Sequence, residues 1–303
     1  MSGKDRQAWS EFWALQKGSA KGGGCLPEGW AGIELAQRAV WKDFAKRIAR
    51  KGRVLDLATG DGRVAAWLKS SRPDCSIVGV DAASTLPSPP KGVNFKPGVA
   101  MESLPFPDAS FDAVTSQFGF EYGEVVKVAG EAARVAKPGA TVGLLVHRGD
   151  GPILRHNATR AEALKWALEE QQVVTKARQA GQLGPALLGG MAKRLEAVAA
   201  EGRQQFGANS PAWEIPEAVR RTLVYEARSE ARGLLPTLAA IERQAGNEIG
   251  RIESLQRACA TADARDNLLA ALSEAGLRTI ETKDVNETGK EPFADFILLE
   301  KTA

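Results

Sequence analysis

The chain has 303 residues, 44% hydrophobic and 25% charged, which suits one large domain or a domain with an insertion and excludes a wholly disordered chain. Its 40 basic and 37 acidic residues give a net charge of +3, so charge alone gives no reason to expect a nucleic-acid or membrane partner. Two histidines and three distant cysteines (Cys25, Cys75 and Cys259) form no pattern typical of a metal site or a disulfide framework.

The sequence predicts a cytoplasmic protein. No apolar stretch approaches the roughly 20 residues that a membrane-spanning helix needs. The first residues, MSGKDRQAWSEFW, lack the apolar core of a secretion signal. We therefore expect no membrane partner and reduced thiols.

Residues 1–50 are predicted to form a helical cap. Trp9, Phe12 and Trp13 fall on one helix face, and a glycine-rich break follows at residues 22–24. Apolar residues then recur at helical spacing from Ile33 to Ile48. The simpler interpretation is packing against the next domain. The alternative is that these aromatic residues also cover a ligand site.

Between residues 53 and 147, strands alternate with helices, which predicts a parallel sheet with right-handed crossovers. The predicted helices are 63–69 and 124–136, the second ended by Lys137-Pro138-Gly139. Residues 82–92 contain three prolines and are predicted to be loop or a single turn. The predicted strands cover residues 53–57, 76–81, 93–96, 111–116 and 141–147.

Residues 152–261 are predicted to be an all-helical insertion after the fifth strand. Ala, Leu, Glu, Arg and Gln predominate there. Thr159 and Glu162 have the spacing of a capping box. From Leu238 to Cys259 the apolar residues follow a heptad pattern that Glu248 interrupts. We expect the insertion to act as a substrate lid or as a surface for a homodimer.

Strands return at residues 277–284 and 293–299, after a predicted helix at 267–275. The short polar turn between these strands makes them antiparallel. The helical block therefore interrupts one α/β domain, formed by residues 51–151 and 262–303. The predicted fold is α/β, with a Rossmann-like, seven-stranded, mostly parallel sheet whose last strand is antiparallel.

A candidate ligand site follows the first strand, at Asp56-Leu-Ala-Thr-Gly-Asp-Gly62. Glycines let the backbone approach a ligand closely. Asp81 ends the second strand, about 20–25 residues later, where an acidic residue binds a ribose diol. Dinucleotide oxidoreductases share this pattern. However, the turn is not G-x-G-x-x-G, and the carboxylate of Asp56 would repel a pyrophosphate, which argues against an NAD-dependent dehydrogenase.

Three ordered segments resemble class I S-adenosylmethionine-dependent methyltransferases of the ubiquinone/menaquinone type and related small-molecule enzymes. They are DLATGDG at 56–62, MESLPFPDASFD at 101–112 and EAARVAKPG at 131–139. The resemblance covers residues 50–150 and 262–303, and leaves out the helical insertion. It implies S-adenosyl-L-methionine as cofactor, no metal, and methyl transfer as the activity.

The resemblance also implies cofactor-binding roles for particular residues. Asp81 would bind the ribose hydroxyls, and the backbone of Met101 would meet the adenine ring, with the side chain of Met101 or Ala82 on a ring face. Gln117 would flank the methionine part or the methyl group. Ala100 departs from the family, which often has an aspartate there to accept from the adenine amino group. The residues that would face the methionine part are Asp56, Ala58, Thr59, Gly60, Asp61 and Gly62.

Candidate catalytic residues lie where strands end. Methyl transfer needs an acceptor placed in line with the S–CH3 bond, and a general base only if that acceptor keeps its proton. Glu121 and Tyr122 follow the fourth strand, and His147 ends the fifth. The alternative for His147 is a structural role, with its ring hydrogen-bonded to a loop carbonyl. The alternative for Glu121 and Tyr122 is that they only start the next helix.

Three functions therefore stay open. The first is a methyltransferase for a small-molecule acceptor, with the insertion forming the substrate pocket. The second keeps the chemistry but acts on RNA or protein; the insertion lacks the basic stripe and interleaved aromatic residues that RNA binding favours. The third is a non-catalytic binding or dimerisation module, suggested by Ala100 and the heptad pattern.

Overall fold

The computed structural model describes residues 3–16, 30–226 and 233–303. The chain divides into two compact units, an α/β unit of residues 1–154 with 254–303 and a helical unit of residues 155–253. The glycine-rich break at 22–24 and Cys25 lie outside the described residues.

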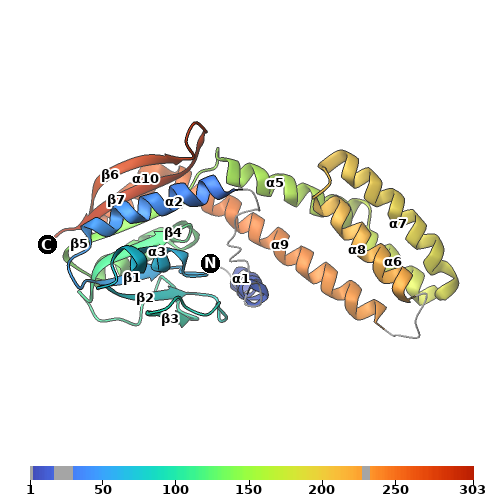
Figure 1. Ribbon diagram of the computed structural model, residues 1–303, viewed down its shortest axis with the longest axis horizontal. Helices are drawn as coiled ribbons and strands as arrows, with labels where there is room; N and C mark the ends of the chain where they lie inside the picture. The colour runs from blue at the N-terminus through green and yellow to red at the C-terminus, as the bar shows by residue number, and fades with distance from the viewer. Residues whose placement is uncertain (1–2, 17–29, 227–232) are drawn as a thin grey trace. The chain divides into compact units, whose positions relative to one another are not determined.

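The α/β unit contains a seven-stranded sheet with strand order β3-β2-β1-β4-β5-β7-β6 (Figure 1). β7 is antiparallel to both of its neighbours, and the other pairs are parallel. The predicted fold class is confirmed. The strands are β1 (Arg53–Leu57), β2 (Ser76–Asp81), β3 (Val93–Pro97), β4 (Phe111–Gln117), β5 (Ala136–His147), β6 (Leu277–Asn286) and β7 (Pro292–Lys301).

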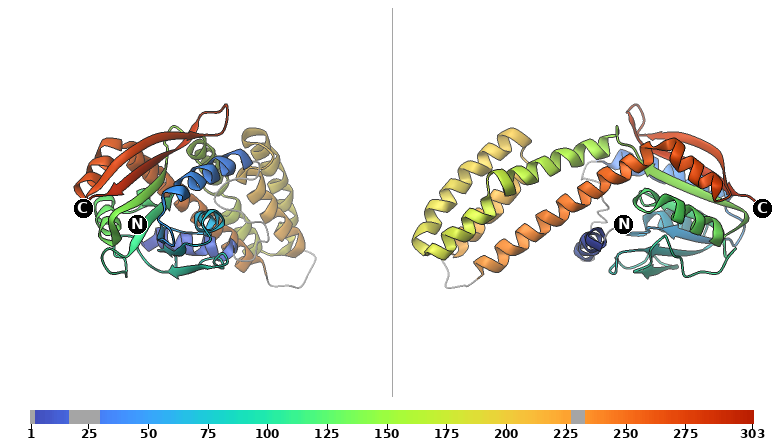
Figure 2. Two further views of the ribbon diagram at one scale, coloured as in Figure 1. Left: turned by 60° about the vertical axis from the view of Figure 1, so that its left-hand side comes forward. Right: turned by 180° about the vertical axis from the view of Figure 1, so that it is seen from behind.

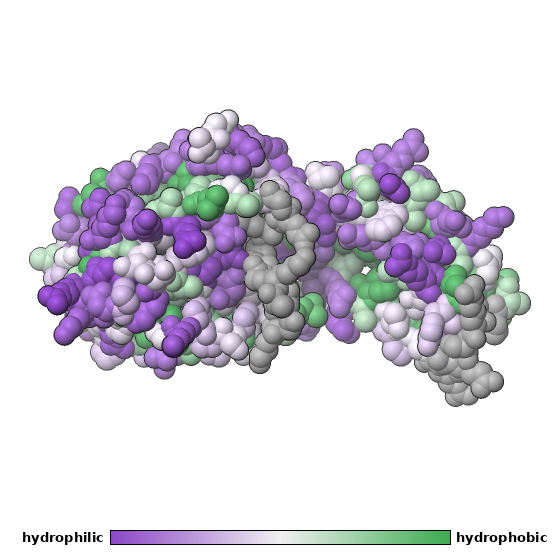
Figure 3. All heavy atoms as spheres, viewed as in Figure 1, coloured by the Kyte–Doolittle hydropathy of each residue, from purple (hydrophilic) through white to green (hydrophobic). Residues whose placement is uncertain are grey.

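Helices cover both faces of this sheet because its strands are apolar on both sides. Val54 of β1 is buried on the face of α2 and α3, whereas Leu55 and Leu57 are buried on the face of α4 and α10 (Figures 1 and 2). On the face drawn in Figure 3, hydrophilic residues cover most of the unit's surface. Its helices are α1 (Gly3–Gln16), α2 (Ala31–Phe44), α3 (Arg63–Ser71), α4 (Val125–Val135) and α10 (Arg265–Glu274), with short 3-10 turns η1 (Ala45–Arg47) and η2 (Phe120–Tyr122).

Two connections show how local sequence shapes the sheet. Residues 82–92 form no helix or strand, as their prolines predict. β5 begins at Ala136, earlier than predicted, because Ala136 pairs with Phe111 before the register shifts. Gly139, at φ +76°, lets the chain bulge before regular pairing resumes at Thr141.

The helical unit has its own apolar core, to which all of its long helices contribute. The predicted capping box at Thr159 is wrong, because α5 already begins at Pro152. The hydroxyl of Thr159 instead donates to the carbonyl oxygen of Arg155, one turn earlier. The helices are α5 (Pro152–Lys165), α6 (Val173–Leu183), α7 (Pro185–Phe206), α8 (Pro211–Glu226) and α9 (Leu234–Asp263), with a π-helical turn η3 (Trp166–Glu170) after α5.

The predicted heptad run forms most of α9. Leu238, Ala245 and Ile252 are buried in the helical unit's own core, so this part of the pattern is used within the chain. Glu248, which interrupts the pattern, accepts a hydrogen bond from the guanidinium of Arg160 at 2.8 Å. Within the described ranges, no helix is both long enough and apolar enough to cross a membrane.

Candidate active site

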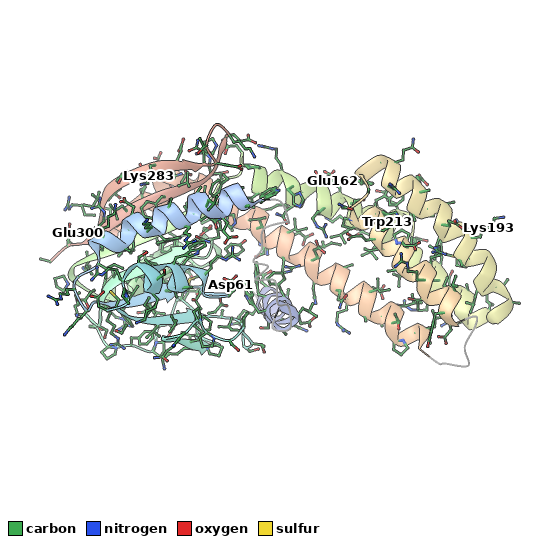
Figure 4. All side chains as sticks on the ribbon, viewed as in Figure 1. Asp61, Glu162, Lys193, Trp213, Lys283 and Glu300 are labelled. Atoms are coloured by element: carbon green, nitrogen blue, oxygen red, sulfur yellow. The ribbon has the colours of Figure 1, made fainter. Side chains whose placement is uncertain are left out.

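The turn between β1 and α3 has a backbone that only glycine adopts readily at two positions. Gly60 has φ +53° and Gly62 has φ +76°. A Cβ on Gly62 would lie 2.5 Å from the ring of Phe95. Asp61, labelled in Figure 4, accepts from the backbone N–H of Arg63 at 3.1 Å and forms an ion pair with its guanidinium at 2.7 Å. These contacts fix the turn at the start of α3.

Asp81, at the end of β2, is joined to this turn. Its Oδ2 accepts from the backbone N–H of Gly60 at 3.0 Å, and its Oδ1 accepts from Ala83 N–H at 2.9 Å. Burial raises the pKa of Asp81. Each carboxylate oxygen accepts one of these bonds and has a further lone pair for a ligand hydroxyl. The structure thus brings the predicted acid and the glycine turn together.

Asp56 lies beneath the turn and is 1% exposed. Its carboxylate accepts from the hydroxyls of Thr59 at 2.6 Å and Thr115 at 2.8 Å. Burial raises the pKa of Asp56 to about 7. Thr115 was not among the predicted site residues. The signal for it is a polar residue in an apolar strand, directly opposite Asp56 in the register.

Ala58 occupies a strained position at the start of the turn. It has φ +51°, in the left-handed region that favours glycine. A Cβ on Gly119 would lie 2.3 Å from the Cβ of Ala58, so the two chain segments approach closely here. The turn therefore has backbone strain and a close contact at one point.

The segment after β3 returns to Asp81. The backbone N–H of Val99 donates to the Asp81 carbonyl at 2.8 Å, which ties the chain just before Ala100 and Met101 to the end of β2. The Met101 side chain is nearly buried in the core on the α4 face, whereas Ala82 is half-buried. Of the two side chains predicted to cover an adenine ring, Ala82 is the more accessible.

Gln117 is turned toward α2. Its Oε1 accepts from Trp41 Nε1–H at 2.7 Å, and its Nε2 donates to Gln37 Oε1 at 3.3 Å. Gln37 is fully buried, and its Nε2 has no hydrogen-bond partner among the described residues. Gln37 was not among the predicted site residues. A polar residue within an otherwise apolar helix face was the available signal.

The three predicted catalytic residues lie together. Glu121 Oε1 accepts from the backbone N–H of His147 at 2.9 Å and lies 2.7 Å from its Nδ1. Both side chains are almost completely buried. The ring of Tyr122 meets the His147 ring edge-on, with centroids 5.9 Å apart, and Phe118 stacks on His147 at 4.1 Å.

Aromatic residues of α1 lie against two parts of this site. A Cβ on Gly60 would be 2.5 Å from the ring of Trp13, so Trp13 lies directly on the glycine turn. Trp13 packs in a small cluster with Ala83, and Trp9 contacts Tyr122 with centroids 6.0 Å apart. α1 therefore packs against the glycine turn and against Tyr122 within the α/β unit.

Comparison with known proteins identifies this unit. Residues 55–144, which hold the glycine turn, Asp81 and the end of β4, match the family model described as "Methyltransferase domain". Residues 55–144 are a class I S-adenosylmethionine-dependent methyltransferase domain. The methyltransferase domain is similar to "Demethylmenaquinone methyltransferase" of Thermus thermophilus, with 39% identity over 123 residues, covering 38% of this chain and 55% of the relative.

A second relative gives the same match. "Demethylmenaquinone methyltransferase" of Deinococcus radiodurans is 40% identical over 102 residues, which cover 31% of this chain and 42% of that protein. The chain spans about half the length of the curated relatives it matches.

Solved structures also align with the chain. The "putative methyltransferase" in a complex with the Trm112 activator from Haloferax volcanii has a TM-score of 0.48 and 14% identity, covering 98% of this chain and 97% of that one. The 1,6-didemethyltoxoflavin-N1-methyltransferase of Burkholderia thailandensis has a TM-score of 0.46 and 10% identity, covering 98% and 88%.

Proposed function

We propose that the chain transfers the methyl group of S-adenosylmethionine to a small-molecule acceptor. The observation that carries the proposal is the carboxylate of Asp81, fixed by the N–H groups of Gly60 and Ala83 beside a glycine turn. A carboxylate with free lone pairs suits a ribose diol, and a turn without Cβ atoms lets a ligand approach the backbone. Because Trp13 lies on Gly60, its ring would contact a ligand bound at this turn.

The acceptor class rests on the relatives. Their names refer to demethylmenaquinone, so a quinone-type small molecule is the first acceptor to test. The helical residues 155–253 follow soon after His147 in the chain and return before α10. We propose from this connectivity that they order the acceptor. RNA and protein acceptors are the alternatives, tested by methyl incorporation into each class.

Calorimetry with S-adenosylhomocysteine tests the cofactor site. We expect the wild-type chain to bind it and Asp81→Asn to bind at least about tenfold more weakly, because a charge-assisted hydrogen bond contributes about 1.5–3 kcal/mol. Asp112→Asn is the matched control. Asp112 also accepts from a backbone N–H, that of Arg53, but at the opposite end of the strands. The Asp112→Asn variant should therefore bind S-adenosylhomocysteine with wild-type affinity.

A folded wild-type chain that does not bind S-adenosylhomocysteine would overturn the proposal. That result would favour the non-catalytic module, because Ala100 supplies no side-chain acceptor for an adenine ring. Equal losses in Asp81→Asn and Asp112→Asn would assign the effect to general destabilisation. Circular dichroism of both variants provides the check on folding.

A further inference from the structure

The pair formed by His147 and Glu121 has one defined ring orientation. Glu121 Oε1 accepts from the backbone N–H of His147, which holds the carboxylate in place. With Glu121 as a carboxylate, which can only accept, the contact at 2.7 Å places the proton on Nδ1. In the neutral ring, Nε2 then holds the lone pair.

This lone pair is available. In the part of the chain that the structure describes, the Nε2 of His147 has no hydrogen-bond partner, although the residue is only 6% exposed. Glu121 Oε2 is also buried without a partner. A buried carboxylate whose second oxygen lacks a donor stabilises a positive charge on the ring beside it. Nε2 can therefore accept a hydrogen bond from a ligand hydroxyl.

Cys259, on α9, supplies no positive charge beside Glu121. Burial, together with the negative charges of Glu121 and Asp263, raises the pKa of the Cys259 thiol to about 12, so the thiol is neutral. Among the described residues, no lysine or arginine forms an ion pair with Glu121. The ring of His147 is thus the side chain that faces this carboxylate.

The surroundings of His147 are aromatic and strained. Phe118 stacks on the ring and Tyr122 meets it edge-on. Phe118 adopts φ +54°, an unfavourable backbone conformation for a bulky residue. Strain of this kind is concentrated at functional sites, where it fixes a side chain in place. An acceptor with a flat apolar ring suits such walls.

We propose that the acceptor is an aromatic hydroxyl compound, that His147 takes its hydroxyl proton, and that Glu121 is the positioning residue. This rests on the proposed function. A lone pair of the acceptor oxygen forms the new O–CH3 bond as the S–CH3 bond breaks. The electron pair of the broken bond stays on sulfur, giving the neutral thioether, and the proton moves to His147 Nε2.

The ring tautomer is the first test and needs no variant of the pair. The chain has only two histidines, so nitrogen-15 spectra of the rings give two sets of signals, and His156→Gln assigns them. We expect a protonated Nδ1 and an unprotonated Nε2 for His147. A protonated Nε2 in the free protein would overturn the proposal.

The second test uses 4-nitrophenol as a chromophoric acceptor analogue, with saturating S-adenosylhomocysteine. At a pH where the free probe is mostly un-ionised, we expect the bound probe to show about a tenfold higher phenolate-to-phenol ratio. Glu121→Gln should abolish this gain, because the amide oxygen still accepts from Nδ1–H but carries no charge. His156→Gln, which changes the other histidine, should retain it.

The outcomes separate this proposal from the proposed function. If S-adenosylhomocysteine binds but the probe does not, or binds un-ionised, the acceptor class and the role of His147 are wrong while the methyltransferase assignment stands. If S-adenosylhomocysteine does not bind, both fail. If Glu121→Gln binds and ionises the probe like wild type, Glu121 is only a structural contact.

Discussion

Ala58 is the residue at which the glycine turn departs most clearly from an unstrained backbone. Its φ of +51° costs about 1–2 kcal/mol for a residue with a Cβ. We expect Ala58→Gly to raise the free energy of unfolding by about 0.5–1 kcal/mol, measured by urea denaturation, since glycine relieves this strain but orders at a larger entropy cost.

Two further variants check this explanation. Ala66→Gly in α3 should lower the free energy of unfolding by about 0.5–1 kcal/mol, because that residue is helical. Gly119→Ala should be better tolerated in the Ala58→Gly chain, where the 2.3 Å overlap with the Ala58 methyl is gone. Additive effects of the two changes would contradict the contact.

Asp56 gives the fold a predicted pH dependence. Burial raises its pKa from 3.8 to about 7, so the folded state binds a proton that the unfolded state releases above pH 4. The contribution of Asp56 is therefore most favourable below about pH 4 and is lost as the pH rises to about 7. We expect the free energy of unfolding to fall over this range through Asp56.

Asp56→Asn isolates this effect. The amide can still accept from Thr59 and can donate to Thr115, but it does not titrate. We expect urea denaturation of this variant to show a smaller decline between pH 4 and pH 7 than that of wild type. Identical pH profiles would mean that Asp56 is ionised throughout.

At the residue level, the sequence predicts which residues form the site better than it predicts the directions of their side chains. The glycine turn and Asp81 form one unit because adjacent parallel strands end at the same edge of the sheet. The direction of Gln117 toward Trp41, and the bond from Thr115 to Asp56, depend on strand register and on where α2 packs. Neither can be read from the spacing of residues along the chain.

At the scale of elements, a charged cluster joins the end of β5 and the start of β7 to the start of α10. Asp295 is 4% exposed and pairs with the guanidinium groups of Arg148, at 2.9 Å, and Arg265. We expect Asp295→Asn to lower the free energy of unfolding by about 2 kcal/mol. Removing one partner of a fully buried ion pair lowers the free energy of unfolding by more than this, but here both arginines are partly exposed.

Asp284→Asn is the matched control, because Asp284 contacts the same Arg148 at 3.1 Å but is largely exposed. Its effect should stay within about 0.5 kcal/mol. Thermal or urea denaturation compares the two variants. Equal losses of unfolding free energy would contradict the assignment of the stabilisation to the buried carboxylate of Asp295.

Element prediction succeeded where periodicity and chain-breaking residues agree. The parallel strands and the proline-rich loop at 82–92 are examples. It failed at Thr159, where a capping pattern lies inside a helix that already starts at Pro152. The capping signal is local, whereas the start of α5 follows from the end of β5, which the pattern around Thr159 does not contain.

At the scale of the whole molecule, the two units have separate apolar cores. We expect a chain in which residues 155–253 are replaced by a flexible linker to fold and to bind S-adenosylhomocysteine with wild-type affinity, since the glycine turn and Asp81 lie in the α/β unit. Calorimetry of the shortened chain measures this. A folded but non-binding chain would place part of the cofactor site in the helical unit.

The homodimer predicted from the heptad pattern is a separate matter. Part of that pattern is buried in the core of the helical unit, as Leu238, Ala245 and Ile252 show. Any dimer would therefore have to use other surface residues. The molar mass of the full chain from light scattering tests the prediction directly.

The place of β7 between β5 and β6 has a consequence for synthesis of the chain. Val142 pairs with Leu299, across the whole helical unit in sequence, so this sheet has a high contact order. While the ribosome is still making residues 155–290, β5 has an unpaired apolar edge, a typical site of misfolding and chaperone capture. Slow translation through the helical unit would lengthen that exposure.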